Sequence, residues 1–189
     1  MFNILRPLVF KFSPEVAHSL AIKALKLNNI SYSKPKESHI LETTFCNKIL
    51  PSPIGVAAGF DKNAEVYNPL LNLGFGFVEV GTITPKAQFG NAKPRVFRLE
   101  EDEALINRLG FNNSGSDEIC NRIKENVKKG FLGINIGPNK DSTNRLEDYL
   151  ICFRKFYNLA DYITINISSP NTENLRNFHN QNELNSLIQ

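Results

Sequence analysis

The sequence predicts an α/β fold of the (β/α)8 TIM-barrel type, of which the chain supplies about the first half. Short apolar segments suited to buried strands alternate with amphipathic helical segments, a pattern that indicates a parallel sheet. Polar residues follow each apolar segment, where such folds place their sites. The first strand–helix turn lacks G-x-G-x-x-G, which favours the barrel over the competing doubly wound open sheet.

The composition excludes several classes of protein. The chain has 189 residues, of which 41% are hydrophobic and 22% charged, as in an ordinary globular domain. A net charge of +3 gives no strong case for nucleic-acid binding. The three cysteines are widely spaced and form no CxxC pair, so they predict neither a zinc site nor a disulfide framework. No stretch reaches the ~18 apolar residues of a membrane span.

The first unit, residues 1–38, is predicted to be two short helices and a polar linker. Ser13 and Pro14 suit the N-cap and first position of the second helix. One face of that helix carries apolar side chains at helical spacing, namely Val16, Leu20, Ala24 and Leu27. Apolar helices fringed by lysine and arginine suit a membrane surface. An ordinary hairpin docked on its own domain would show the same pattern, so both alternatives stay open.

The second unit, residues 39–189, is predicted to hold four strand–helix units. Two short β segments at 43–46 and 48–50 precede a first strand at 54–58. The remaining strands are expected at 77–81, 131–136 and 162–165. Helices are expected at 64–73, 116–129 and 144–158, and a new helical period begins near Leu184.

Two helices have a definite expected buried side. The helix at 116–129 places Ile119, Ile123 and Val127 on one face. The helix at 144–158 directs inward the side chains of Leu146, Tyr149, Leu150, Phe153, Phe156 and Tyr157. Residues 95–99 and 104–108 flank an acidic turn and predict an inserted β-hairpin.

Uncharged hydrogen-bonding groups and one amine follow the predicted strands. They are Lys62, Thr82, Asn135, Asn166 and Ser169, joined by Asn107 from the hairpin. Each alone would be a surface group, and residues 166–172 would make a good helix-capping turn. Because parallel strands end on one rim, the set together indicates a site. Its amides and hydroxyls suit a planar polar ligand better than a metal.

Several stretches resemble the motifs of quinone-dependent (class 2) dihydroorotate dehydrogenases, in the same order along the chain. They are residues 57–62, 79–82, 93–99, 106–113, 133–137 and 166–172. The resemblance implies a flavoenzyme of de novo pyrimidine (UMP) biosynthesis. Such an enzyme oxidises (S)-dihydroorotate to orotate with FMN and passes electrons to a membrane quinone.

The resemblance also implies roles for individual residues. Ser169 matches the catalytic base, with Thr172 as a candidate proton relay; the related soluble class has cysteine at the base position. Substrate-binding positions are Lys62, Asn107, Arg108, Leu109, Gly110, Phe111, Asn166 and Asn171. FMN-binding positions are Ala58, Gly59, Phe60, Asp61, Lys62, Thr82, Asn135 and Asn166. His18 and Arg98 match positions for quinone access, and no metal site is implied.

The resemblance further implies a monomer bound peripherally to the cytoplasmic side of the cell inner membrane, through residues 1–38. The family's motifs from strands five to eight, including its flavin-phosphate loops, are absent from these 189 residues. We therefore expect the chain alone to bind FMN poorly and to turn over little. The alternatives are another FMN-dependent barrel oxidoreductase and a non-catalytic, membrane-associated fragment.

Overall fold

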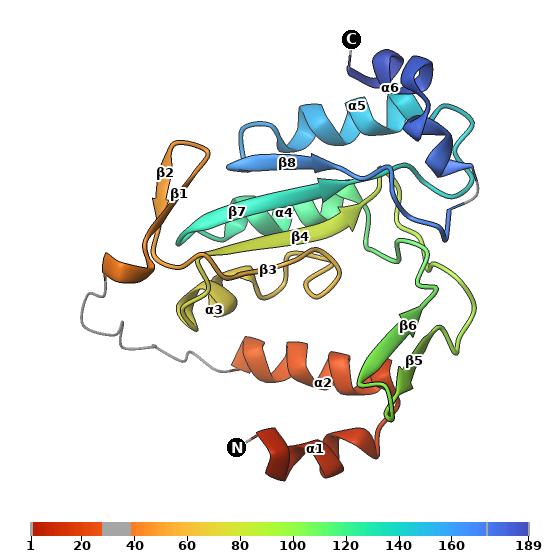
Figure 1. Cartoon of the computed structure of the whole chain (residues 1–189). Helices are drawn as coiled ribbons and strands as arrows, with labels where there is room; N and C mark the ends of the chain where they lie inside the picture. The colour runs from red at the N-terminus through yellow and green to blue at the C-terminus, as the bar shows by residue number, and fades with distance from the viewer. Residues whose placement is uncertain (1, 28–38, 173, 189) are drawn as a thin grey trace.

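The main sheet consists of parallel strands that neighbour one another in chain order. The computed structural model describes residues 2–27, 39–172 and 174–188; the predicted linker at 28–38 lies outside them. The strands are β3 (Gly55–Val56), β4 (Phe77–Ile83), β7 (Phe131–Ile136) and β8 (Tyr162–Ile165), in the order β3-β4-β7-β8 (Figure 1). A doubly wound sheet reverses its strand order at a switch point, whereas a barrel does not. The unreversed order therefore agrees with a sector of a barrel.

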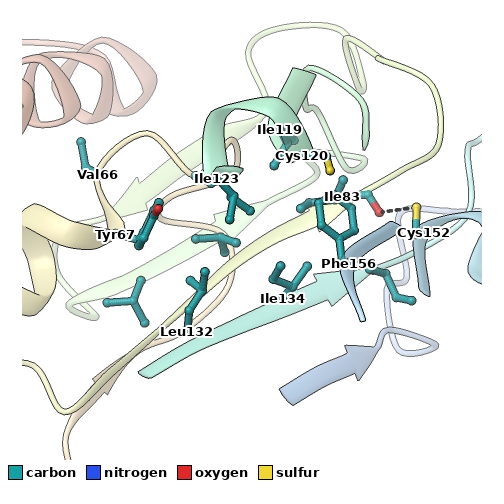
Figure 2. Close-up of a cluster of buried hydrophobic side chains, with 14 of the residues drawn as sticks. Val66, Tyr67, Ile83, Ile119, Cys120, Ile123, Leu132, Ile134, Cys152 and Phe156 are labelled. Atoms are coloured by element: carbon teal, nitrogen blue, oxygen red, sulfur yellow. Dashed lines mark hydrogen bonds between the residues drawn. The ribbon is translucent and has the colours of Figure 1, made fainter. Parts of the chain in front are cut away.

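The two faces of this sheet differ in chemistry. One face packs against the helices and is apolar: Val78, Val80 and Ile134 are fully buried there. The covering helices are α3 (Tyr67–Asn72), α4 (Ser116–Glu125) and α5 (Arg145–Phe156) (Figure 2). Because side chains alternate along a strand, the intervening residues Glu79 and Asn135 occupy the opposite face, which lines the interior of a barrel.

An antiparallel hairpin closes the end of the sheet where the strands begin. It consists of β1 (Thr43–Phe45) and β2 (Lys48–Leu50), as predicted. The ring of Phe45 lies 6.2, 5.6 and 5.4 Å from the rings of Phe77, Phe131 and Tyr162. This aromatic cluster fills the interior at the strands' N-terminal ends, so the open rim is at their C-terminal ends.

The N-terminal helices lie beside the inserted hairpin, and both predictions are confirmed (Figure 1). The helices are α1 (Phe2–Phe10) and α2 (Pro14–Leu27), and the hairpin is β5 (Val96–Leu99) with β6 (Ala104–Asn107). The buried guanidinium of Arg95 joins them, because its Nε and Nη2 donate to Glu15 Oε1 at 3.0 and 2.8 Å. Val16, Leu20 and Leu27 are exposed, whereas Ile22 of α2 faces the core.

Some element boundaries were predicted wrongly. β3 is only two residues long, while β4 continues to Ile83. α3 begins at Tyr67 rather than at residue 64, because Ala64 has a positive φ of 53°. α4 ends at Glu125, where Asn126 turns to extended backbone, so Val127 lies outside the helix and is 85% exposed.

The predicted buried side of α5 was also only partly right. Tyr149, Cys152 and Phe156 are buried, whereas Leu150, Phe153 and Tyr157 are exposed. Helical periodicity identifies an apolar surface but cannot say which element covers it. A short 3-10 helix, η1 (His39–Leu41), precedes β1, and a second, η2 (Leu175–His179), leads into α6 (Gln181–Ile188) after β8.

Candidate active site

Three polar side chains meet at the C-terminal ends of adjacent strands. Thr82 Oγ1 donates to Asn135 Oδ1 at 2.6 Å. Asn166 Nδ2 lies 3.0 Å from Thr82 Oγ1 and 3.2 Å from Asn135 Oδ1. The structure therefore brings together three of the six rim residues found in the sequence. The cluster offers neutral donors and acceptors at one rim.

The backbone holds this rim in register. Gly81 N–H donates to Asp61 O at 3.1 Å, and Gly59 N–H donates to Gly81 O at 2.9 Å. Gly81 has φ +109°, and a Cβ there would lie 2.4 Å from Asn135 O. Only glycine fits this position, because it tolerates positive φ and carries no side chain. Gly81 thus lets Thr82 and Asn135 approach each other.

Lys62 lies in the turn after β3 and is partly buried. Its Nζ donates to Gly59 O, and burial lowers the pKa of the ammonium group while the nearby Glu15 carboxylate opposes that shift. Asp61 accepts from the N–H groups of Glu65 and Val66, both at 2.8 Å, and burial raises its pKa. Asp61 therefore shapes the turn, while Lys62 supplies a cation near the rim.

The loop after β8 contains the predicted base. Ser169 is partly buried, and its Oγ accepts from Asn171 N–H at 3.2 Å. Thr172 is 4% exposed. Two side chains fasten the start of this loop: Arg176 Nε donates to Ser168 O at 3.1 Å, and His179 Nε2 lies 3.1 Å from Ile167 O.

The segment after β6 runs along the other side of the strand ends. Asn107 is exposed, and no hydrogen bond found among the described residues joins its side chain to the Thr82–Asn135–Asn166 cluster. Arg108 donates to Pro94 O, which folds its side chain back along the hairpin. Phe111 has a positive φ of 53°, and its ring lies beside Gly137. Aromatic residues rarely adopt this backbone conformation, which is found mostly at constrained sites.

The two positions predicted for quinone access contact the N-terminal helices or the turn after β3. His18 Nε2 lies 2.7 Å from Phe60 O, and its ring meets the Phe60 ring edge-on at 5.3 Å. Arg98 Nη1 donates to Phe12 O at 2.8 Å, and its guanidinium lies 4.6 Å from the centre of the Phe10 ring. Both residues therefore couple the helices to the barrel unit.

Sequence reasoning missed Glu79, which lies just below the rim. Its carboxylate accepts from Asn135 Nδ2 at 2.8 Å, Tyr162 OH at 2.9 Å and Thr164 Oγ1 at 3.1 Å. Burial, followed by this carboxylate, raises the pKa of Tyr162. A charged residue inside an otherwise apolar strand was the signal that could have identified it.

The described residues contain no cluster of three or more His, Cys, Asp or Glu side chains placed to hold a metal ion. Within the same ranges, no helix combines the length and the apolar character needed to cross a bilayer.

Comparison with known proteins places these features in a family. The profile of the family "Dihydroorotate dehydrogenase" matches residues 40–189. Relatives named "Dihydroorotate dehydrogenase (quinone)" include one from Nitrosomonas europaea, 46% identical over 100% of this chain and 56% of the relative. The mitochondrial enzyme of Cyclocybe aegerita is 49% identical over 97% of this chain and 56% of its own length.

Solved structures support the same family assignment. The crystal structure of DHODH from Eimeria tenella in complex with ferulenol superposes with a TM-score of 0.86 at 41% identity. The match covers 93% of this chain and 49% of that one. The chain therefore spans about half the length of the relatives that it matches.

Proposed function

The chain belongs to the dihydroorotate dehydrogenase family, and on that premise we propose that its residues form the part of the enzyme that oxidises (S)-dihydroorotate to orotate, with FMN as cofactor and a membrane quinone as electron acceptor. The observation that carries the proposal is the cluster of Thr82, Asn135 and Asn166 at the strand ends. Its neutral donors and acceptors suit the amide and imide edges of a flavin and a pyrimidine.

The donors and acceptors of this rim support FMN as the cofactor. No atom lies within 4 Å of where a Cβ would stand at Gly59, so a ligand can approach the backbone of the turn after β3 there. Ala58 to Lys62, Thr82, Asn135 and Asn166 would hold the flavin. When bound, FMN supplies the acceptor for the hydride that leaves C6 of dihydroorotate.

Ser169 would take the proton from C5, so that the substrate loses a hydride and a proton together. A serine hydroxyl is a poor base unless its proton can move on. Thr172 follows three residues later and is nearly inaccessible, which favours a short relay over direct loss to bulk water. Lys62 would neutralise the carboxylate of the substrate. Asn107, Asn166 and Asn171 would read its ring edge, beside the segment of Arg108, Leu109, Gly110 and Phe111.

The N-terminal helices would rest on the cytoplasmic side of the inner membrane and admit the quinone. Support comes from the exposed apolar side chains Leu8, Phe12, Val16 and Leu20, which belong to α1, α2 and the turn between them. An amphipathic helix pair of this kind can lie in a membrane interface without crossing it. His18, against Phe60, would stand between that surface and the flavin.

The test joins this chain to the remaining C-terminal part of the Nitrosomonas europaea relative and follows dihydroorotate oxidation with a soluble quinone. Ser169→Ala should lower kcat by about 10²–10⁴-fold at pH 7 while flavin absorbance is retained. Ser142→Ala, a hydroxyl in the loop after β7, serves as the matched control and should keep its rate. An unchanged rate in Ser169→Ala, or a protein without flavin absorbance, would contradict the proposal.

A further inference from the structure

The substrate segment, residues 108–111, is held to the rest of the rim through its backbone carbonyl groups. Each carbonyl oxygen of the segment accepts a hydrogen bond from Gln88, Asn91 or Asn113. The pairs are Asn91 Nδ2 to Arg108 O at 2.8 Å, Asn91 N–H to Leu109 O at 3.0 Å, Gln88 Nε2 to Gly110 O at 3.1 Å and Asn113 Nδ2 to Phe111 O at 2.8 Å. The segment therefore takes its position largely from the loop after β4, which contains Gln88 and Asn91.

The side-chain amide of Gln88 bridges the substrate segment and the loop after β7. Its NH₂ group donates to Gly110 O, while its Oε1 accepts from Asn139 Nδ2 at 2.9 Å and from Lys140 N–H at 3.0 Å. The orientation of this amide is fixed, because a carbonyl oxygen only accepts hydrogen bonds and a backbone N–H only donates them. A side chain with acceptors at both ends could not make this bridge.

A second amide makes the same bridge with the same polarity. Asn91 donates from Nδ2 to Arg108 O, and its Oδ1 accepts from Lys140 Nζ at 3.0 Å. The loop after β7 is a firm base for both bridges, because the N–H of buried Asn139 donates to Asp148 Oδ2 of α5 at 2.9 Å. The two amides thus transmit the position of that loop to the substrate segment.

The backbone conformation of the substrate segment needs such support. Gly110 and Phe111 both have positive φ, 72° and 53°. An aromatic residue keeps this conformation only where the surrounding contacts determine it. The ring of Phe111 packs on the first residue after β7, since its Cε2 lies 3.2 Å from where a Cβ would stand at Gly137.

We propose that Gln88 and Asn91 are positioning residues of the substrate site, whose amides set the substrate segment on the loop after β7 and so place Phe111 at the rim. Neither residue is among the positions expected to touch substrate or flavin. The role assigned to them rests on the proposed function, because it concerns the segment that would contact dihydroorotate.

The first test measures the position of Phe111 in the 189-residue chain, without flavin or substrate. Gln88→Glu has nearly the same shape and keeps an acceptor for Lys140, but it loses the NH₂ group that holds Gly110 O. The NMR signals of Gly137 should therefore shift, because the aromatic ring beside this residue moves. Gly133, which lies within β7, should keep its signals and so show that the sheet persists.

The second test measures kinetics in the joined enzyme. Gln88→Glu should raise KM for dihydroorotate about tenfold, the equivalent of one lost hydrogen bond. Its kcat should change little, because Ser169 and the turn after β3 lie in other segments. Asn91→Asp, which keeps its acceptor for Lys140, should raise KM in the same direction.

Gln181→Glu is the matched control, because it makes the same change at an exposed position in α6. It should leave both KM and the Gly137 signals as they are in the parent. The proposal fails if the Gly137 signals of Gln88→Glu match those of the parent, or if its KM equals that of Gln181→Glu. A joined enzyme that does not oxidise dihydroorotate would contradict the proposed function, whereas the Gly137 signals would still decide whether Gln88 places Phe111.

Discussion

Replacing Asp161 with asparagine should destabilise the fold measurably, because one carboxylate joins three segments. Asp161 Oδ1 accepts from Lys48 of β2 at 2.5 Å, and Oδ2 accepts from Lys128 and from Leu132 N–H, both at 2.8 Å. The side chain of Asp161 is 3% exposed, but Lys48 and Lys128 are 59% and 32% exposed. Solvent screening limits each ion pair to about 0.5–1 kcal/mol. The Leu132 N–H can still bond to the asparagine oxygen, but a hydrogen bond to a neutral acceptor is worth about 1 kcal/mol less than one to a carboxylate.

Asp161→Asn should therefore lower the free energy of unfolding in urea by about 2–3 kcal/mol at pH 7. Glu118→Gln, which removes an exposed pair within one helix, should cost at most about 0.5 kcal/mol. Burial alone would raise the pKa of Asp161, but the Leu132 N–H and the two lysines lower it overall. A carboxyl with a lowered pKa stabilises the fold above its unfolded pKa of about 3.9. The difference between parent and variant should hold down to about pH 4 and shrink below it. A loss under about 0.5 kcal/mol, or a difference that persists at pH 2, would refute this account.

Three further outcomes follow from the site and the core. In the joined enzyme, Lys62→Met should raise KM for dihydroorotate at least about tenfold. The parent's KM should rise as pH climbs through the lowered pKa of Lys62, whereas the variant's KM should stay flat. Burial raises the pKa of Cys152 to about 12, so maleimide at pH 7 should label exposed Cys46 and spare Cys152 until urea unfolds the chain. Gly81→Ala should cost about 2–4 kcal/mol of stability in urea, because its Cβ would meet Asn135 O at 2.4 Å.

The sequence predicted the strands well because their signal is local. β7 and β8 agree with the predicted boundaries, because each is a short run rich in β-branched or aromatic residues with polar or turn-forming residues on both sides. The hairpin of β5 and β6 was equally visible, because an acidic turn separates two alternating segments. The strand-end positions of Thr82, Asn135 and Asn166 followed from those strands, and the structure brings all three into contact.

What the sequence could not show depends on contacts between distant segments. Arg95 and Glu15 are 80 residues apart in the sequence. The residues around each of them do not indicate that the two side chains will pair and hold α2 against the hairpin. The end of α4 at Glu125 follows from Asn126 and from the Asn68 side chain, which accepts from Lys129 N–H across 61 residues. On α5, the exposed stripe has the same periodicity as a buried one, so the pattern alone could not separate them.

The charge on Glu79 also determines which way the side-chain amides at the rim above it are oriented. A carboxylate only accepts hydrogen bonds, so Asn135 must turn its NH₂ group toward Glu79 and its Oδ1 toward Thr82 and Asn166. Asn166 must then present its NH₂ group to Asn135, which leaves its own Oδ1 to accept from Ser168 N–H at 3.2 Å. The Glu79 carboxylate in β4 thus fixes the orientation of the side-chain amides of Asn135 and Asn166. Through Asn166 its effect reaches the loop after β8, which contains the proposed base. An amide at position 79 would remove that constraint, because glutamine can face Asn135 with either its oxygen or its NH₂ group. Amide-nitrogen NMR signals of Asn135 and Asn166 in Glu79→Gln should therefore shift together, and a shift confined to Asn135 would show that the orientation of Asn166 is set independently.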